Sequence, residues 1–206
     1  MTDQAETGDL VRCPWVGFAD PVYTRYHDEE WGVPAADDRA LFEKLILEGF
    51  QSGLSWLTIL RKRDNFRRAF HGFDPVEIAR FGANDMARLL ADPGIVRNRL
   101  KIEAAVDNAK AFIALAERQS LASFLWGFLD AGPIINRHSL LSDIPPQTDL
   151  SQRISKALKS RGFRFVGPTT VYALMQSVGM VNDHLVSCHR HAVCARLQRD
   201  FRLPNL

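Results

Sequence analysis

Two histidines and two cysteines could form a metal site that joins the two ends of the chain. His184 and Cys188 stand four residues apart, which on a helix would place an imidazole and a thiolate on one face. Cys13 and His27 could complete a tetrahedral Cys2His2 set, and four protein ligands would make the site structural. The alternative is packed thiols and hydrogen-bonded imidazoles, because the N-terminal pair lacks a standard finger spacing. Residues that could compete as ligands are His189, His191 and Cys194.

Aromatic residues form a second group that could take part in binding. Three of the four tryptophans and two of the three tyrosines fall early in the chain, at Trp15, Tyr23, Tyr26, Trp31 and Trp56. Aromatic rings stack on nucleobases at about 1–3 kcal/mol per base, and they also bind cations over their faces. The same residues could equally form part of the hydrophobic core. Their concentration in one segment favours a binding role without deciding between the two interpretations.

Glu48 is a candidate for an acidic group inside a binding pocket. Residues 41–56 follow a helical period in which Glu48 falls at i+7 from Leu41 and at i+3 from Leu45, beside the apolar stripe. Glu43 faces solvent on the same expected helix. A carboxylate at this boundary either extends into water or is held in a pocket for a purpose. Position alone favours the first interpretation.

Residues 159–173 could hold a phosphate group. A basic helix ends at Gly162, a tight apolar turn follows, and a second helix begins with Pro168 and Thr169. Glycines allow the backbone to approach a phosphate closely, and the free N–H groups at a helix start can bind it. Such contacts fix the position of DNA without reading its sequence. The alternative is an ordinary helix end followed by a tight corner.

The elements that would position these residues are helices. Residues 98–117 place apolar side chains at i, i+3, i+4 and i+7, and most of the chain follows this period. Polar start signals precede such runs at Asp20-Pro21, Asp64, Asp74-Pro75, Asn84 and Asp149. Much β character is confined to residues 132–141. We therefore expect an all-α fold of about eight to ten short helices.

Length and composition are typical of an ordinary globular protein. The 206 residues are 46% hydrophobic and 24% charged, which excludes disordered and collagen-like chains. The formal charge of +2 is too small to argue for nucleic acid by itself. We expect one domain over residues 1–206, with two lobes and frayed ends at about 1–11 and 195–206.

The sequence pattern does not indicate a membrane span or a signal peptide. No apolar run is long enough to cross a membrane, and the first ten residues do not resemble a signal peptide. Three cysteines, an odd number, favour thiols or a metal site over disulfides. We therefore expect a cytoplasmic protein without membrane contact, and no protein partner is implied.

Several long strings of this sequence resemble the 3-methyladenine DNA glycosylase I family. They are RCPW at residues 12–15, DPVYTRYHDEEWGVP at 20–34, LEGFQSGLSW at 47–56, RGFRFVG at 161–167 and GMVNDH at 179–184. The similarity is collinear over about residues 12–190. The resemblance implies an all-α helix-hairpin-helix DNA glycosylase that acts on double-stranded DNA containing alkylated purines.

The resemblance also implies roles for particular residues. Both ends of the chain would form a lobe around one structural Zn²⁺ held by Cys13, His27, His184 and Cys188. Glu48 would be the catalytic-site carboxylate that recognises the methylated adenine. The base would be enclosed by Tyr26 and Trp56, with Trp15, Tyr23 and Trp31 as further wall residues. Gln51, Gly53 and Leu54 would face the duplex, with Leu54 as a wedge that fills the space left by the flipped base. DNA phosphates would be held by the hairpin residues Gly162, Val166, Gly167 and Thr169.

Two departures from the wider superfamily bear on the reaction. Many relatives place a catalytic aspartate where this chain has Asn182, and Asp183 follows on what we expect to be a helix, pointing in another direction. Bifunctional relatives carry a lysine where this chain has Thr169, so we expect no Schiff base and no strand cleavage. The expected enzyme is therefore monofunctional. Alternatives are a glycosylase for another alkylated purine, such as 3-methylguanine or 7-methylguanine, and a non-catalytic DNA-binding module.

Overall fold

The computed structural model describes residues 10–17 and 20–202, and this part of the chain is predominantly helical, as predicted. Its α-helices are α1 Pro21–Glu29, α2 Asp38–Gln51, α3 Trp56–Ala69, α4 Pro75–Ala79, α5 Ala83–Ala91, α6 Arg99–Ala116, α7 Leu121–Trp126, α8 Asp149–Lys159, α9 Pro168–Ser177 and α10 His189–Asp200. Three 3-10 turns add η1 Pro14–Val16, η2 His71–Phe73 and η3 Leu141–Asp143. The short strands β1 Ile134–Ile135 and β2 Val181–Asn182 pair in parallel, with Ile134 opposite Val181.

Several helix starts follow the predicted signals. The Asp20 carboxylate accepts hydrogen bonds from the backbone N–H groups of Val22 and Tyr23 and so caps α1. Asp74 caps α4 in the same way, and α6 lies within the predicted 98–117 segment. Asp64 is a wrong prediction, because it lies inside α3, which begins at Trp56 after the cap Ser55.

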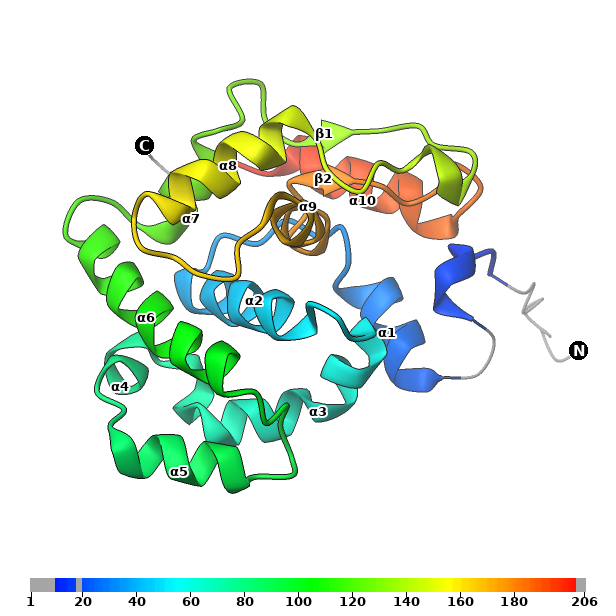
Figure 1. Cartoon of the computed structure of the whole chain (residues 1–206). Helices are drawn as coiled ribbons and strands as arrows, with labels where there is room; N and C mark the ends of the chain where they lie inside the picture. The colour runs from blue at the N-terminus through cyan, green and yellow to red at the C-terminus, as the bar shows by residue number, and fades with distance from the viewer. Residues whose placement is uncertain (1–9, 18–19, 203–206) are drawn as a thin grey trace, which may run out of the picture.

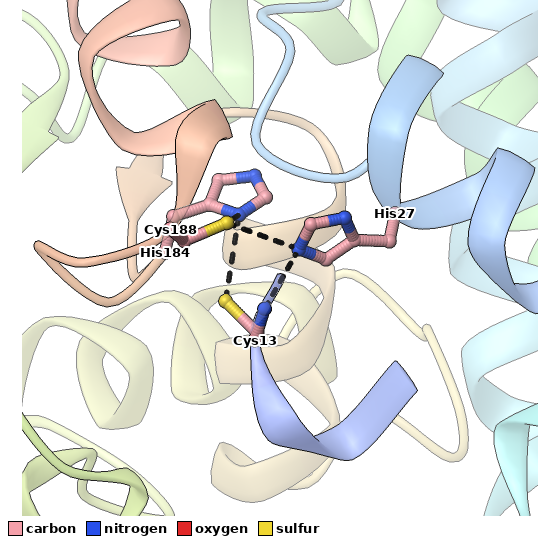
Figure 2. A group of neighbouring side chains, drawn as sticks. All are labelled: Cys13, His27, His184 and Cys188. Carbon is pink, nitrogen blue, oxygen red and sulfur yellow. Dashed lines mark hydrogen bonds between the residues drawn. The ribbon is translucent and has the colours of Figure 1, made fainter. Parts of the chain in front are cut away.

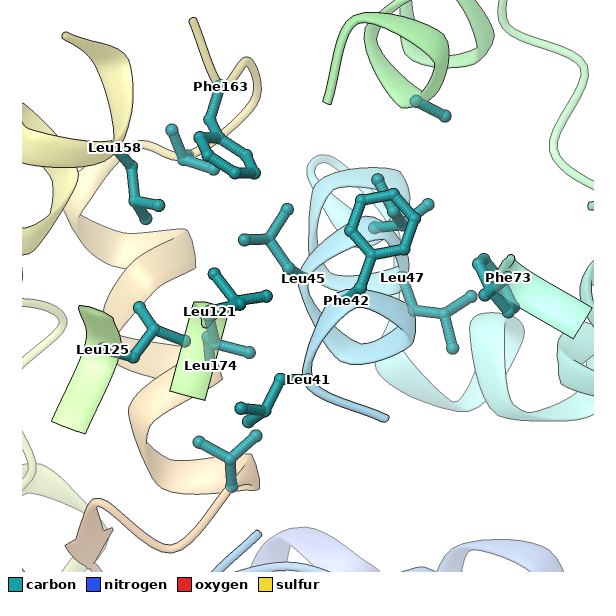
Figure 3. Packing of buried hydrophobic residues seen from close by; sticks show 14 of the residues in the cluster. Leu41, Phe42, Leu45, Leu47, Phe73, Leu121, Leu125, Leu158, Phe163 and Leu174 are labelled. Atoms are coloured by element: carbon teal, nitrogen blue, oxygen red, sulfur yellow. The ribbon is translucent and has the colours of Figure 1, made fainter. Parts of the chain in front are cut away.

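Helix α2 runs through the middle of the molecule and organises the core (Figure 1). It contacts α3 and α6 on one side and α7 and α9 on the other. Figure 3 shows its side chains Leu41, Phe42, Leu45 and Leu47 packing toward residues of these neighbours, and all four are buried. Full burial of each such side chain contributes roughly 1.5–3 kcal/mol. The core thus holds α2, which carries Glu48, in a fixed orientation.

Helices α8 and α9 form the predicted pair joined by a tight turn. Gly162 has a φ of +88°, a left-handed conformation that favours glycine. From α8, the Ser155 hydroxyl donates to the Val166 carbonyl of the turn at 2.6 Å. The Asn108 side chain on α6 accepts from the Arg164 N–H at 2.6 Å and donates to the Arg164 carbonyl at 3.1 Å. The turn is therefore anchored from both α8 and α6.

The N-terminal segment lies beside the start of α10, and the C-terminal end is more ordered than predicted. The His189 N–H donates to the Val11 carbonyl at 2.9 Å, and Figure 1 shows this N-terminal segment beside the start of α10. The expectation that residues 195–206 fray is wrong for 195–200, since α10 extends to Asp200. Gln198 is 1% exposed and donates to the carbonyls of Gly32 and Gly179. Residues 1–9 and 203–206, also expected to fray, lie outside the described residues.

The segment between β2 and α10 also differs from the prediction. His184 and Cys188 were expected on one helix, but His184 lies in an irregular turn after β2, and Cys188 caps the start of α10. Asp183 likewise follows a strand and does not lie on a helix. None of the described helices is both long enough and apolar enough to cross a membrane.

Candidate active site and metal centre

The four predicted ligand residues meet in one buried group that could hold a metal ion (Figure 2). Their ligand atoms all lie within 4.8 Å of one another. The Cys13 Sγ lies 3.6 Å from Nδ1 of His184, and the Cys188 Sγ lies 3.4 Å from Nε2 of His27 and 3.6 Å from Nδ1 of His184. The turn before α10 therefore brings His184 and Cys188 together, although they do not share a helix.

The outer nitrogen of each imidazole is held by an acceptor. His27 donates from Nδ1 to Asp28 at 2.7 Å, and His184 donates from Nε2 to the Trp31 carbonyl at 2.9 Å. Arg12 in turn binds Asp28 at 2.8 Å. Metal-binding histidines typically have such partners, which direct the remaining ring nitrogen toward the ion. The group therefore has the second layer of contacts expected of a metal site.

The residues considered as competing ligands have other partners. His191 lies 2.8 Å from the Asn136 carbonyl through Nε2, and His189 lies 3.1 Å from the Val11 carbonyl through Nδ1. The Cys194 Sγ lies 3.8 Å from the Trp31 carbonyl. None of the three belongs to the ligand group found among the described residues.

A cavity of about 400 Å³ lies beside this metal group and contains the predicted aromatic residues. Trp15, Tyr23, Tyr26, Trp31 and Trp56 all line it, together with Glu48 and Gln51. Trp15 contacts the rings of Tyr23 and Trp31, each at 5.0 Å between centroids, whereas Tyr26 and Trp56 form a separate pair at 5.5 Å. Helix α1 and the start of α3 thus supply much of an aromatic enclosure.

Glu48 is a buried acid in the wall of this cavity. It is 4% exposed, so the interpretation that it extends into water, favoured by position alone, is wrong. Burial raises the pKa of Glu48 from its usual 4.5 to about 8, although the charge of Lys44 and a hydrogen bond from Ser177 oppose the rise. The helix predicted from periodicity is present, but α9 covers the face on which Glu48 lies.

A charged network behind Tyr26 was not predicted. The Lys44 Nζ lies 4.6 Å from the centre of the Tyr26 ring and donates to Glu30 at 3.1 Å. Arg63 donates to both carboxylate oxygens of Glu30, at 2.6 and 2.7 Å. Burial raises the pKa of Glu30, but these two cations outweigh it and hold the pKa at about 2. Lys44 precedes Glu48 by one helical turn, which is the signal that could have suggested this charge near the pocket.

The remaining cavity wall comes from distant parts of the chain. Residues missing from the prediction are Leu141, Ile144, Pro145, Pro146, Tyr172, Ala173 and Gln176. Thr169, expected to bind phosphate, also lines this cavity. The loop between β1 and α8 and the helix α9 therefore complete the wall of the cavity.

The residues expected to face DNA form a rim and a turn. Leu54 is 39% exposed in a turn where its N–H donates to the Gln51 carbonyl, while Gly53 has a φ of +79°. Lys101 donates to the carbonyls of Phe50 and Ser52 at 2.8 and 2.5 Å and so holds the end of α2. In the second turn Val166 is 2% exposed as a whole residue, and its carbonyl accepts from the Ser155 hydroxyl, so the structure does not present Val166 at the surface as a DNA contact would require.

Asn182 occupies the position of the superfamily aspartate but has a structural role. Its side chain donates to the His191 carbonyl at 3.0 Å and accepts from the His184 N–H at 3.2 Å. It therefore holds the turn that carries a metal ligand. Asn182 is fully buried and does not line the cavity.

The aromatic rings and the buried Glu48 carboxyl group give this helical fold a cavity that suits a flat, electron-poor ring. A family model described as methyladenine glycosylase matches residues 15–191, and the chain belongs to this family, as its motifs predicted. The chain is 48% identical over 180 residues to DNA-3-methyladenine glycosylase 1 of Escherichia coli (strain K12), covering 87% of this chain and 96% of that protein.

Solved structures agree with this family assignment. A crystal structure of 3-methyladenine DNA glycosylase I is similar with a TM-score of 0.85 at 49% identity, covering 87% of this chain and 98% of that one. A structure of 3-methyladenine DNA glycosylase I from Staphylococcus aureus, described as the basis of 3-methyladenine recognition, is similar with a TM-score of 0.83 at 38% identity. The match covers 88% of this chain and 97% of that one.

Proposed function

We propose that this protein is a DNA-3-methyladenine glycosylase, which hydrolyses the N-glycosidic bond of 3-methyladenine in alkylated double-stranded DNA and so starts base-excision repair. The observation that carries the proposal is the Glu48 carboxyl group, buried in a cavity lined by aromatic rings. Membership in the methyladenine glycosylase family supports the substrate, as do the names of the relatives. A DNA substrate also accords with the cytoplasmic location that the cysteine content favours.

The chemistry of the damaged base reduces what the enzyme must supply. 3-Methyladenine in DNA is positively charged, so its glycosidic bond is already weakened and the base leaves as a neutral molecule that needs no proton. The enzyme has to extrude the base from the duplex, distinguish it from adenine and allow water to capture the developing sugar cation. An aromatic enclosure with a single acid suits these tasks.

We assign recognition of the base to Glu48, Tyr26 and Trp56. The two rings would hold the cationic purine between them, because ring faces attract positive charge. The Glu48 carboxylate would accept hydrogen bonds from the base and offset its charge. Trp15, Tyr23 and Trp31 would complete the wall. Glu48 therefore acts chiefly in recognition and adds electrostatic stabilisation as charge moves to the sugar.

The protonation state of Glu48 links this pocket to its ligand. With a pKa of about 8, the carboxyl group is largely protonated near neutral pH when the cavity is empty. A cationic base beside it favours the ionised form, so uptake of the damaged nucleotide releases a proton. The same step is unfavourable for neutral adenine, which supplies no charge to replace the lost proton.

DNA engagement is assigned to two exposed turns, in a helix-hairpin-helix arrangement. Gln51, Gly53 and Leu54 would face the duplex, and Leu54 would insert to fill the space of the extruded nucleotide. Backbone N–H groups at the end of the α8–α9 turn, at Gly167 and Thr169, would hold a DNA phosphate. The N–H groups of Gly162, Phe163 and Arg164 already donate within the protein, so Gly162 would shape the turn and not bind the phosphate itself. Gly167 directly precedes the start of α9, where free N–H groups are available. Contacts of this kind position the duplex and leave base selection to the cavity.

We assign one structural Zn²⁺ to the Cys2His2 group. Typical zinc–sulfur and zinc–nitrogen bonds would separate a sulfur from a nitrogen ligand by roughly 3.6 Å in a tetrahedron. The sulfur–nitrogen distances of 3.4–3.6 Å agree with this geometry. The ion would neutralise the buried thiolates and tie the N-terminal segment to the start of α10. All four positions are occupied by protein ligands, so its contribution is to stability.

The protein is a monofunctional glycosylase. Thr169, at the position of the superfamily lysine, offers a hydroxyl group and no amine for a Schiff base. Thr169 also lines the cavity, so the site near the base lacks an amine at this position. The expected products are therefore free base and an intact strand with an abasic site.

Single-turnover release of 3-methyladenine from methylated duplex DNA tests the proposal. Glu48→Gln and Glu48→Ala should slow release well beyond threefold, which corresponds to about 0.7 kcal/mol. Glu43→Gln on the same helix is the matched control. Glu43 is less exposed than predicted, because it pairs with Arg67 at 2.8 Å, but it does not line the cavity, so this variant should retain wild-type release. Wild-type rates in both Glu48 variants would refute the assigned role. Binding of methylated duplex without any release of base would instead indicate a non-catalytic DNA-binding module.

A further inference from the structure

A buried carboxylate that the reaction scheme does not use lies behind one wall of the cavity. Asp183 is 1% exposed and directly follows β2. One of its oxygens, Oδ2, accepts from the Tyr172 hydroxyl at 2.6 Å and from Nε2 of Gln176 at 2.7 Å. The other, Oδ1, accepts from Nδ2 of Asn136 at 2.7 Å, and Nε2 of His138 lies 3.3 Å away. Four polar groups thus converge on one side chain.

Two of these partners belong to the cavity wall. Tyr172 and Gln176 lie one turn apart on α9, and both line the cavity that contains Glu48. The Gln176 backbone is fixed as well, since its carbonyl accepts from the N–H of Gly32 at 3.1 Å. Asp183 therefore controls how a cavity residue, anchored at its backbone, directs its side chain.

This contact determines which end of the Gln176 amide remains free. A carboxylate only accepts hydrogen bonds, so Gln176 must turn its NH2 group toward Asp183. Its carbonyl oxygen Oε1 then faces away from Asp183 and forms no hydrogen bond with any described residue of the chain. A glutamine that lines the cavity therefore offers an unused acceptor.

We propose that Asp183 is a positioning residue, and that it makes Gln176 an acceptor for the exocyclic amine of the flipped purine. The inference rests on the proposed function and names the feature by which the cavity selects its substrate. Adenine-type bases carry an N–H donor on C6, whereas guanine-type bases carry an acceptor oxygen there. An acceptor at the wall favours the 6-amino purine and repels the 6-oxo purine. Gln176 is then a specificity-determining residue.

The test measures kcat/KM for release of 3-methyladenine and of 3-methylguanine from the same methylated duplex. Gln176→Met removes the acceptor with little change in volume and should lower the 3-methyladenine preference about tenfold. Asp183→Ala frees the Gln176 amide to rotate and should lower the 3-methyladenine preference to a similar extent. The double variant should lose no more than Gln176→Met alone, because Asp183 acts through Gln176. The ratio of the two substrates cancels any loss of folded enzyme.

Asn136→Ala is the matched control, because Asn136 binds the other oxygen of Asp183 and does not line the cavity. The Asn136→Ala variant should show the same ratio of kcat/KM for 3-methyladenine over 3-methylguanine as the wild type. The proposal is overturned if Gln176→Met keeps the wild-type preference within threefold, or if Asp183→Ala keeps it while Gln176→Met loses it. Failure of the proposed function is a different result, in which the wild-type protein releases no 3-methyladenine at all.

Discussion

Replacing Glu48 with glutamine should stabilise the ligand-free protein at alkaline pH while it removes most of the activity. Below pH 4.5 the carboxyl group is protonated in both the folded and the unfolded chain, so its titration does not affect stability. Between 4.5 and about 8 the unfolded chain releases a proton that the folded protein retains. A rise in pH therefore favours unfolding of the wild-type protein and has no such effect on Glu48→Gln.

The size of the effect follows from the rise in pKa. A shift from 4.5 to about 8 corresponds to roughly 5 kcal/mol at about 1.4 kcal/mol per pH unit, an upper bound reached above pH 8. Between pH 5 and pH 9, the wild-type protein should lose roughly 4 kcal/mol of unfolding free energy relative to Glu48→Gln. Burial of Glu48 thus lowers the stability of the ligand-free protein at alkaline pH, while the same buried acid favours binding of a cation.

Urea denaturation of both proteins at pH 5 and pH 9 measures this difference directly. Glu43→Gln removes a different carboxylate of the same helix, one paired with Arg67 at 2.8 Å, and keeps Glu48, so it should retain most of the wild-type pH dependence. The reasoning fails if the difference between wild type and Glu48→Gln is the same at both pH values. Such a result would mean that Glu48 titrates near its ordinary range despite its burial.

Three further predictions concern rate, DNA and metal. kcat/KM for base release should rise about tenfold per pH unit up to pH 8 and stay level in Glu48→Gln; identical profiles would contradict the ionisation scheme. Leu54→Ala should weaken binding of lesion duplex about tenfold and retain binding of free 3-methyladenine, whereas equal losses would indicate a folding defect. Elemental analysis should find about one zinc per chain, and a metal-free protein of unchanged Tm would rule out the structural ion.

Local signals in the sequence predicted local structure well. Asp20 and Asp74 precede prolines and cap helices, and the periodic segment 98–117 contains α6. These predictions depend on side chains a few residues apart, which meet in any compact fold. The prediction at Asp64 failed because an acid followed by an amphipathic run is also found within helices, and Ser55 already caps this helix upstream.

Features that depend on distant segments were predicted only in part. The spacing of His184 and Cys188 brings both residues into the metal group, although the connection is a turn and not a helix. The contacts of Asp183 with Gln176 and Asn136 join three separate segments, and no local pattern indicates them. The loop at 141–146 closes the cavity through apolar residues that have no characteristic spacing.

The sequence by itself determined the helical class, the family and the set of residues that could bind a metal, a ring or a phosphate. Residue type and spacing carry that information, because it concerns what each side chain can do. Only the tertiary structure decided that Glu48 is buried with a pKa of about 8 and that Gln176 presents its carbonyl oxygen. Burial and hydrogen-bond direction depend on neighbours supplied by other helices, and those neighbours are set by the packing of the whole chain.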